Sequence, residues 1–277
     1  MGIDFEDWFH PELIQRNITS TKNNPTVING IDKILDLLRK NNAYATFFVV
    51  GELLEYKPDI LDKIIEQGHE IGFHTMHHSR LDSLGYKEKF QEELEQFNVL
   101  TSGKSKGFRA PTFSLNYSAS WAIDFLTKNN YLYDSSIVPA KTSMYGIPNA
   151  ETKPYKISSS ILEKNDPSGT IIEFPLLVTR FLGKTIPAGG GFFLRFLPIK
   201  IIKNAISDYE KKDMPACCYI HSWELTPEFM PKIPLPFKDR FITYYNLKKA
   251  LNRMREILQN FKFTSFERYI SNSNLLN

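Results

Sequence analysis

The sequence predicts an α/β fold in which a mostly parallel sheet carries helices on both faces. Two observations indicate this class. Short apolar runs, such as ATFFVV at residues 45–50, alternate with segments in which apolar residues recur at helical spacing. Strands that alternate with helices favour parallel pairing through crossover connections. The spacing alone leaves open whether the sheet stays open or closes into a barrel.

In the first half of the chain, each predicted strand is a short apolar run and each helix a periodic segment. One helix has apolar residues spaced from Ile31 to Leu38 and ends at Asn41 and Asn42, and Gly68 is expected to follow the end of another. The strands are expected at residues 3–5, 45–50 and 69–73, with further helices at 53–67 and 86–100.

The second half continues the alternation with one gap. Residues 143–168 have no clear pattern, and no element is predicted there. Elsewhere, a strand is expected to lead into Phe108, further strands at 131–133, 171–174 and 216–220, and helices at 118–128 and 246–261.

Length and composition describe one globular unit. The chain has 277 residues and no linker-like stretch, and α/β barrels of roughly 250 residues form single domains. We therefore expect one domain over residues 1–277. The net charge of +3 and the lack of a basic stripe give no indication of nucleic-acid binding.

The sequence also bears on location. No apolar run approaches the ~20 residues of a membrane span, and acidic residues stand where a secretory signal would be basic and then apolar. Cys217 and Cys218 are adjacent and do not form a disulfide framework. These features predict a cytoplasmic protein without a transmembrane segment.

Polar side chains repeatedly follow the predicted strands. The carboxyl ends of barrel strands form the face on which active sites are built. A strand must end in something polar, but convergence of several groups of metal-ligand or acid-base type favours a site over chance. These residues are Asp4, Glu6, Asp7, His74, Arg109, Asp134 and His221.

Histidines cluster after one of these predicted strands. Three of the six lie within residues 74–78, and the H-x-x-x-H spacing of His74 and His78 suits two imidazoles on one ion. Because the preceding GHEIGF reads as a strand, the pair is expected on a turn that curls back. A catalytic zinc-type site takes three protein ligands and keeps one position open, so a carboxylate from residues 4–7 would complete it.

The order of the motifs resembles one family. D-x-E-D-W-F-H, ATFFVVG, G-H-E-I-G-F-H-T-x-x-H-H, G-F-R-A-P, Y-D-S-S and Y-I-H-S-W-E follow one another over roughly residues 1–270. This order resembles the polysaccharide deacetylases of carbohydrate esterase family 4, in the branch associated with bacterial exopolysaccharide and surface-glycan loci. The resemblance implies a distorted (β/α)7 barrel and one divalent metal ion, usually zinc, with cobalt, nickel and manganese as alternatives.

The resemblance also implies roles for individual residues. His74 and His78 match the histidine ligands, whereas His77 does not match a ligand position. Asp4 matches the general base, Arg109 the arginine that orients this base, and His221 the general acid that protonates the leaving amine.

This chain departs from the family where two adjacent aspartates usually end the first strand. Here the carboxylates are Asp4, Glu6 and Asp7. Side chains at i and i+2 share a strand face, which favours Glu6 as the metal ligand, whereas a bulge after Phe5 would bring Asp7 to the metal. A second departure concerns the partner of the acid histidine, for which Asp134 lies off the usual place and Glu224 is the alternative.

Four further residues are expected to contact substrate. Pro111 and Trp223 lie inside matched motifs, Asp134 follows a strand, and Gly190 belongs to a three-glycine run that is either a sugar-contacting loop or a flexible turn.

The expected activity is metal-dependent removal of an N-acyl group, acetyl above all, from an amino sugar of a glycan or glycan precursor. The alternatives are a deacylase for an N-formyl or ring amide, a non-catalytic carbohydrate-binding relative, and a glycoside hydrolase, which would use two carboxylates and no metal.

Overall fold

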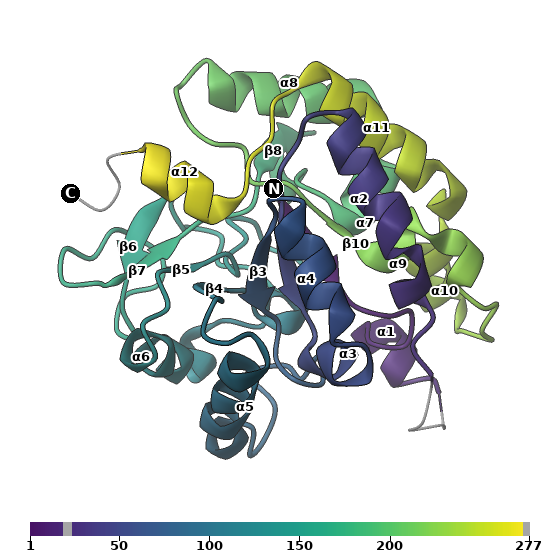
Figure 1. Ribbon diagram of the computed structural model, residues 1–277. Coiled ribbons are helices and arrows are strands. Elements are labelled where there is room, and N and C mark those ends of the chain that lie inside the picture. The colour runs from purple at the N-terminus through teal and green to yellow at the C-terminus, as the bar shows by residue number, and fades with distance from the viewer. Residues whose placement is uncertain (19–23, 274–277) are drawn as a thin grey trace.

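The computed structural model describes residues 1–18 and 24–273, in which a curled central sheet is surrounded by helices (Figure 1). The sheet has eight strands in the order β10-β1-β2-β3-β4-β5-β7-β6. The strands are β1 (Gly2–Phe5), β2 (Thr46–Val49), β3 (Glu70–Phe73), β4 (Gly107–Phe108), β5 (Tyr133–Asp134), β6 (Tyr155–Ile157), β7 (Ile171–Glu173) and β10 (Tyr219–His221).

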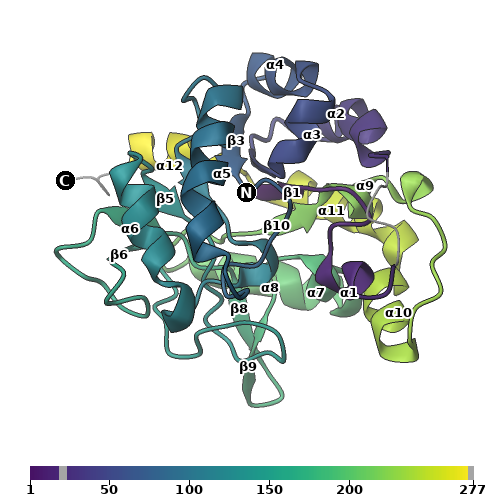
Figure 2. The ribbon, with the colours of Figure 1, turned by 90° about the horizontal axis from the view of Figure 1, so that it is seen from below.

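Seven of these strands run parallel, from β10 through β1 to β7, and β6 joins the edge antiparallel to β7. The sheet curls until the chain after β7 meets β10 through two isolated parallel bridges, Leu176 with Cys217 and Gly190 with Tyr219. The predicted distorted α/β barrel is therefore confirmed. A separate hairpin, β8 (Val178–Phe181) with β9 (Lys184–Pro187), projects from the body of the molecule (Figure 2).

The helices pack around the outside of the barrel (Figure 1). In the part of the chain that the structure describes, none is both long and apolar enough to cross a bilayer. They are α1 (Glu12–Gln15), α2 (Ile31–Lys40), α3 (Gly51–Tyr56), α4 (Asp59–Glu66), α5 (Lys87–Leu100), α6 (Trp121–Lys128), α7 (Gly191–Phe196), α8 (Ile199–Glu210), α9 (Ser222–Leu225), α10 (Phe237–Tyr244), α11 (Ala250–Asn260) and α12 (Phe266–Asn272).

The inner strands are buried over their whole length, which explains their continuous apolar runs. Every residue of β1, β2 and β3 is buried. Parallel strands with both faces covered lose the alternation of apolar and polar residues. Phe73 shows how the outer layer packs, since its ring lies 4.7 Å from that of Phe97 in α5, measured between centroids.

The structure differs from the sequence prediction in one predicted helix and in several elements that were not predicted. The single helix expected at 53–67 is two helices, α3 and α4, separated at Lys57 and Pro58. Proline restricts the residue before it to extended backbone, and Lys57 has φ −144° and ψ 81°. The segment without a prediction contributes the edge strand β6. The other elements that were not predicted are the β8–β9 hairpin and the helices α1, α7, α8, α9, α10 and α12.

The three glycines at 189–191 allow close approach of two backbones. A Cβ on Gly190 would lie 1.8 Å from the carbonyl oxygen of Tyr219, and one on Gly189 would lie 2.7 Å from that of Cys217. Only glycine permits this contact. The glycine run therefore closes the barrel against β10. This role differs from both predicted ones, the flexible turn and the sugar-contacting loop.

Candidate active site

The polar residues that follow β1, β3, β4 and β10 gather at one end of the barrel. Because the strands are parallel and adjacent, with Asp4 in register with His221, their carboxyl ends meet at the same edge. This end carries Asp4, Glu6, His74, His78, Arg109 and His221.

Glu6, His74 and His78 form a cluster of potential metal ligands. One ligand atom from each lies within 4.8 Å of the others, and all three residues are buried. Nε2 of His78 lies 2.6 Å from Oε2 of Glu6. Despite this short distance, no donor among the described residues, His78 included, reaches that oxygen with hydrogen-bond geometry. A buried carboxylate oxygen without a donor, facing two imidazoles, fits a divalent cation.

His74 is held as a neutral ligand. Its Nδ1 lies 2.6 Å from the carbonyl oxygen of Arg109, and since a carbonyl only accepts, Nδ1 carries the proton. Burial lowers the pKa of His74 to about 4, so the ring is uncharged at neutral pH. A backbone partner of this kind fixes the tautomer of a metal-binding histidine and leaves Nε2 free to bind.

The two histidines lie on a loop that turns back, as expected, rather than on a helix. Thr75 and His78 both have left-handed backbone, with φ of 59° and 55°. Residues other than glycine rarely adopt this conformation, and it is frequent at functional sites. His77 points away from the cluster, is exposed, and lies 2.9 Å from Glu52 through Nδ1.

The turn after β1 brings Glu6, and not Asp7, to the cluster. Burial alone would raise the pKa of Glu6, but the charges of His78 and His221 outweigh burial and lower it. Oε1 of Glu6 also accepts a hydrogen bond of 2.9 Å from the indole of Trp223.

Asp7 faces away from the cluster and caps a neighbouring segment. Its Oδ2 accepts hydrogen bonds from the amides of Thr26 at 2.6 Å and Val27 at 2.7 Å. The structure therefore does not bring Asp7, the alternative ligand of the sequence analysis, to the histidines.

Asp4 lies beside the cluster and is paired with Arg109. Nη1 of Arg109 donates to Oδ1 of Asp4 at 2.6 Å, and both side chains are buried. The remaining donors of the guanidinium bind Ser135, through its carbonyl oxygen and its hydroxyl. The guanidinium therefore holds the Asp4 carboxylate in a fixed position beside the cluster.

His221 has Glu224 as its partner. Its Nδ1 lies 2.7 Å from Oε2 of Glu224, and Nε of Arg195 donates to the other oxygen at 2.5 Å. Burial would lower the pKa of His221, but the Glu224 and Glu6 carboxylates raise it to about 9. Burial likewise opposes ionisation of Glu224, but Arg195 and His221 lower its pKa to about 2. His221 is thus held protonated in the metal-free chain.

Asp134, the other candidate partner, lies elsewhere. Its carboxylate accepts from the Ser136 hydroxyl at 2.6 Å, and it is paired with Glu173, whose pKa is raised by burial and then by the Asp134 charge. Asp134 is fully buried and does not line the pocket over the Glu6, His74 and His78 cluster. Its expected contact with substrate is therefore not supported. Arg195 was not predicted as a site residue, and its one signal in the sequence is a lone arginine inside the apolar segment FFLRF.

A pocket of about 390 Å³ opens over the cluster. Trp223, one of the expected substrate contacts, lines it, whereas Pro111 and Gly190 do not. Residues next to these two do: Thr112 and Phe113 follow Pro111, and Phe192 follows the glycine run. The predicted motifs therefore contribute to the pocket lining, but through the residues that follow Pro111 and Gly190.

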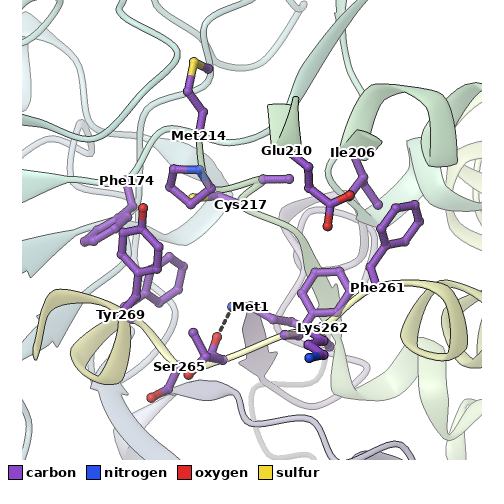
Figure 3. A pocket seen from close by; sticks show the side chains of 15 residues that line it. Met1, Phe174, Ile206, Glu210, Met214, Cys217, Phe261, Lys262, Ser265 and Tyr269 are labelled. Atoms are coloured by element: carbon purple, nitrogen blue, oxygen red, sulfur yellow. Dashed lines mark hydrogen bonds between the residues drawn. The ribbon is translucent and has the colours of Figure 1, made fainter. Parts of the chain in front are cut away.

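A second, smaller cavity of about 160 Å³ lies between α8, α12 and the segment that precedes β10 (Figure 3). Its lining is mainly apolar, with Glu210 and Lys262 as the charged side chains and Cys217 as the only sulfhydryl. This lining includes no histidine and no pair of carboxylates, so it does not compete as a catalytic site.

Two protein families match the chain. Residues 25–127 match the polysaccharide deacetylase family. The chain contains a polysaccharide deacetylase family domain. Residues 135–271 match a family described as a domain of unknown function (DUF3473). The deacetylase match holds His74, His78 and Arg109, the second match holds His221, and Asp4 precedes both.

Several of the similar proteins are named as deacetylases. A peptidoglycan-N-acetylglucosamine deacetylase of Bacillus cereus is 35% identical over 104 residues, which are 36% of this chain and 36% of that protein. A chitooligosaccharide deacetylase of Sinorhizobium fredii is 35% identical over 63 residues, which are 23% of this chain and 29% of that protein. The chain thus spans well under two thirds of the length of either relative.

The fold is shared with a solved structure. A putative polysaccharide deacetylase from Mycobacterium smegmatis superposes with a TM-score of 0.60 at 15% identity, over 98% of this chain and 88% of that one. This likeness extends over both family matches, so the barrel is common to the two proteins along their length.

Proposed function

We propose that this protein is a metal-dependent hydrolase that removes an N-acyl group from an amino sugar, with acetyl as the preferred acyl group. The observation that carries the proposal is the Glu6, His74 and His78 cluster, with Asp4 paired to Arg109 beside it and His221 near Glu6. These are the parts that amide hydrolysis requires: a Lewis acid, a base and an acid. The deacetylase relatives agree with it.

The ligand set fits zinc. Two neutral imidazoles and one carboxylate are a common catalytic zinc set with an open position, and the orphaned oxygen of Glu6 is the acceptor that such an ion would satisfy. Polysaccharide deacetylases depend on a metal ion, and we propose zinc, with cobalt, nickel and manganese as alternatives. When bound, the ion would activate water and stabilise negative charge on the acyl oxygen.

The side chains divide the proton transfers between them. Asp4, positioned by Arg109, takes a proton from the attacking water as the C–O bond forms. His221 gives the proton of Nε2 to the amine nitrogen as the C–N bond breaks. Glu224 holds Nδ1 of His221 and so directs Nε2 toward the pocket. The products are a carboxylate and a free amine.

The competing functions differ in what they need from these residues. A glycoside hydrolase needs two carboxylates flanking the bond, whereas here one carboxylate is paired with Arg109 and the other faces two histidines. A non-catalytic carbohydrate-binding relative would not need the His221, Glu224 and Arg195 chain. Hydrolysis of an N-formyl or ring amide would use the same groups, so only an assay with each substrate distinguishes these activities from deacetylation.

We further propose that residues 1–277 act as one domain. The proposed catalytic groups come from both sides of the boundary between the two family matches, since His74, His78 and Arg109 precede it and His221 follows it. The sheet also continues across it, from β5 to β7. Neither part holds the complete set of proposed catalytic groups.

The function is tested by acetate release from a panel of N-acetyl and N-formyl amino sugars and a cyclic amide, with zinc added. We expect release from an N-acetyl sugar, loss of activity on chelation, and recovery on adding zinc. The matched control is His77→Ala, which removes an exposed histidine one residue from a proposed ligand. Activity that survives chelation, or activity on no N-acylated sugar, would contradict the proposal.

A further inference from the structure

Helices α7 and α10, with the residue that follows α10, carry a row of aromatic side chains, which we call the aromatic ridge: Phe192, Phe196, Phe237, Phe241 and Tyr245. Phe196, Phe237 and Phe241 are exposed, and Phe192 and Tyr245 are half-buried. The two helices lie near each other (Figure 2), and the ring centroids of Phe192 and Phe241 are 5.9 Å apart. Phe237 precedes Phe241 by four residues and shares its helix face. Exposed fractions of 46% for Phe196 and 77% for Phe237 are high for such side chains.

The aromatic ridge continues into the pocket. Phe192 lines the pocket and also stacks on Phe196, with centroids 5.2 Å apart. The apolar part of the pocket lining includes Leu13, Ile186, Pro187, Phe192, Phe193 and Ile242. One continuous apolar surface therefore leads from the metal cluster to the outside of the molecule.

Three cations border this surface. Lys141 lines the pocket, and Lys238 and Arg240 stand on α10 between the two exposed phenylalanines. Among the described residues, none of the three makes an ion pair with a carboxylate. The guanidinium of Arg240 lies 6.0 Å from the ring centroid of Phe237. Unpaired cations beside exposed rings suit a molecule with an apolar chain and an anionic or polar head.

We infer that the substrate is an amphiphile, an amino sugar joined to a hydrocarbon chain, and that the chain lies along the aromatic ridge while the sugar occupies the pocket. The inference rests on the proposed function, since it places the N-acyl group at the metal cluster. A contiguous exposed apolar surface that runs into a polar site marks a binding surface for a ligand with both characters.

A longer sugar chain would fit this surface less well. Sugar hydroxyls need hydrogen-bond partners, and phenylalanine rings provide neither donors nor acceptors. Tyr245 carries the one hydroxyl of the aromatic ridge. The nearby Asp239 carboxylate is buried and already accepts hydrogen bonds from Arg16 at 2.6 Å and Asn17 at 3.2 Å. The chemistry therefore favours hydrocarbon over carbohydrate.

The test compares the methyl and octyl β-glycosides of N-acetylglucosamine, the octyl compound below its micelle concentration. Binding to the zinc-loaded protein is measured by calorimetry, and acetate release is measured on the same samples. We expect the octyl glycoside to bind at least tenfold more tightly, because each buried methylene adds to affinity. In the variant Phe196→Ser/Phe237→Ser/Phe241→Ser, this ratio should fall to within about threefold of unity.

The matched control is Leu182→Ser, which removes an exposed apolar side chain at the β8–β9 hairpin and should keep the wild-type ratio. Equal binding of the two glycosides by the wild type would overturn the inference, whatever the activity. Two results with the triple variant would also overturn the inference. One is an unchanged ratio of octyl to methyl glycoside binding. The other is a loss of binding to an N-acetylglucosamine tetramer or to phosphatidylcholine vesicles that contain no sugar. Tight octyl binding without acetate release would instead contradict the proposed function alone.

Discussion

Arg195 and His221 bind opposite oxygens of the same buried carboxylate, that of Glu224. The guanidinium donates from Nε at 2.5 Å, and Nδ1 of the imidazole lies 2.7 Å from the other oxygen. Arg195 also donates to the carbonyl oxygens of Ile242 and Tyr245, at the end of α10. The proposed acid is therefore positioned by a chain of charges that joins α7, α9 and α10.

Removing the charge of Glu224 should lower the pKa of His221. His221 must be protonated to act as the acid, so the basic limb of the kcat/KM profile reports loss of this proton. Because the Glu224 carboxylate raises the pKa of His221, Glu224→Gln should shift that limb to lower pH by about one unit or more. His221→Asn should abolish the limb. A limb that persists in His221→Asn would assign the acid to another group.

Glu6→Gln should weaken zinc binding by about tenfold or more, since even the loss of residues behind the ligands costs that much. Asp7→Asn is the matched variant, one residue away, and should keep near-wild-type affinity while lowering stability, because Asp7 accepts the amides of Thr26 and Val27. Competition with a chelating dye measures both. The double variant His74→Ala/His78→Ala should bind no ion. Loss of the ion in Asp7→Asn but not in Glu6→Gln would show that Asp7 and not Glu6 is the ligand.

Asp4→Asn should lower kcat by roughly a hundredfold or more without a comparable loss of zinc, because a proposed base and not a ligand is changed. Asp36→Asn, on the exposed face of α2, serves as the control and should leave both quantities unchanged. Measured zinc content separates the two effects. An Asp4→Asn enzyme with wild-type kcat would remove Asp4 from the mechanism.

His69, at the amino end of β3, should make stability fall in mild acid. Burial, with a smaller contribution from Arg268, lowers its pKa to about 4 in the folded chain. Nδ1 accepts the amide of Ala45 at 3.3 Å, which a protonated ring cannot do. The unfolded chain binds the proton near pH 6.5, so stability is complete above that pH and is lost toward pH 4.

Thermal unfolding of the metal-free chain between pH 7.5 and 5 tests this expectation. His69→Gln should reduce the decline by roughly 1 kcal/mol. His77→Gln is the control of opposite sign, because Glu52 raises the pKa of His77 and so adds stability at low pH. An unchanged decline in His69→Gln would contradict the assignment.

Much of the fold and of the site could be predicted from sequence because the information is local. Buried parallel strands require continuous apolar runs, and the helices between them require periodic ones, so most elements were recognised within a few residues. The residues proposed for the site follow directly upon these strands, as with His74 after β3 and His221 at the end of β10. The one clear local error, the break at Pro58, follows from a steric rule on the preceding residue.

The tertiary structure decided what depends on contacts between distant segments. The choice between Glu6 and Asp7 depends on the turn after β1, and Thr26 and Val27 hold Asp7 away from the histidines. The partner of His221 depends on packing, since α7 delivers Arg195 to Glu224 across 29 positions of sequence. Sequence determines which chemical groups are available at the strand ends, whereas the direction of each side chain follows from backbone turns and from hydrogen bonds made by residues far along the chain.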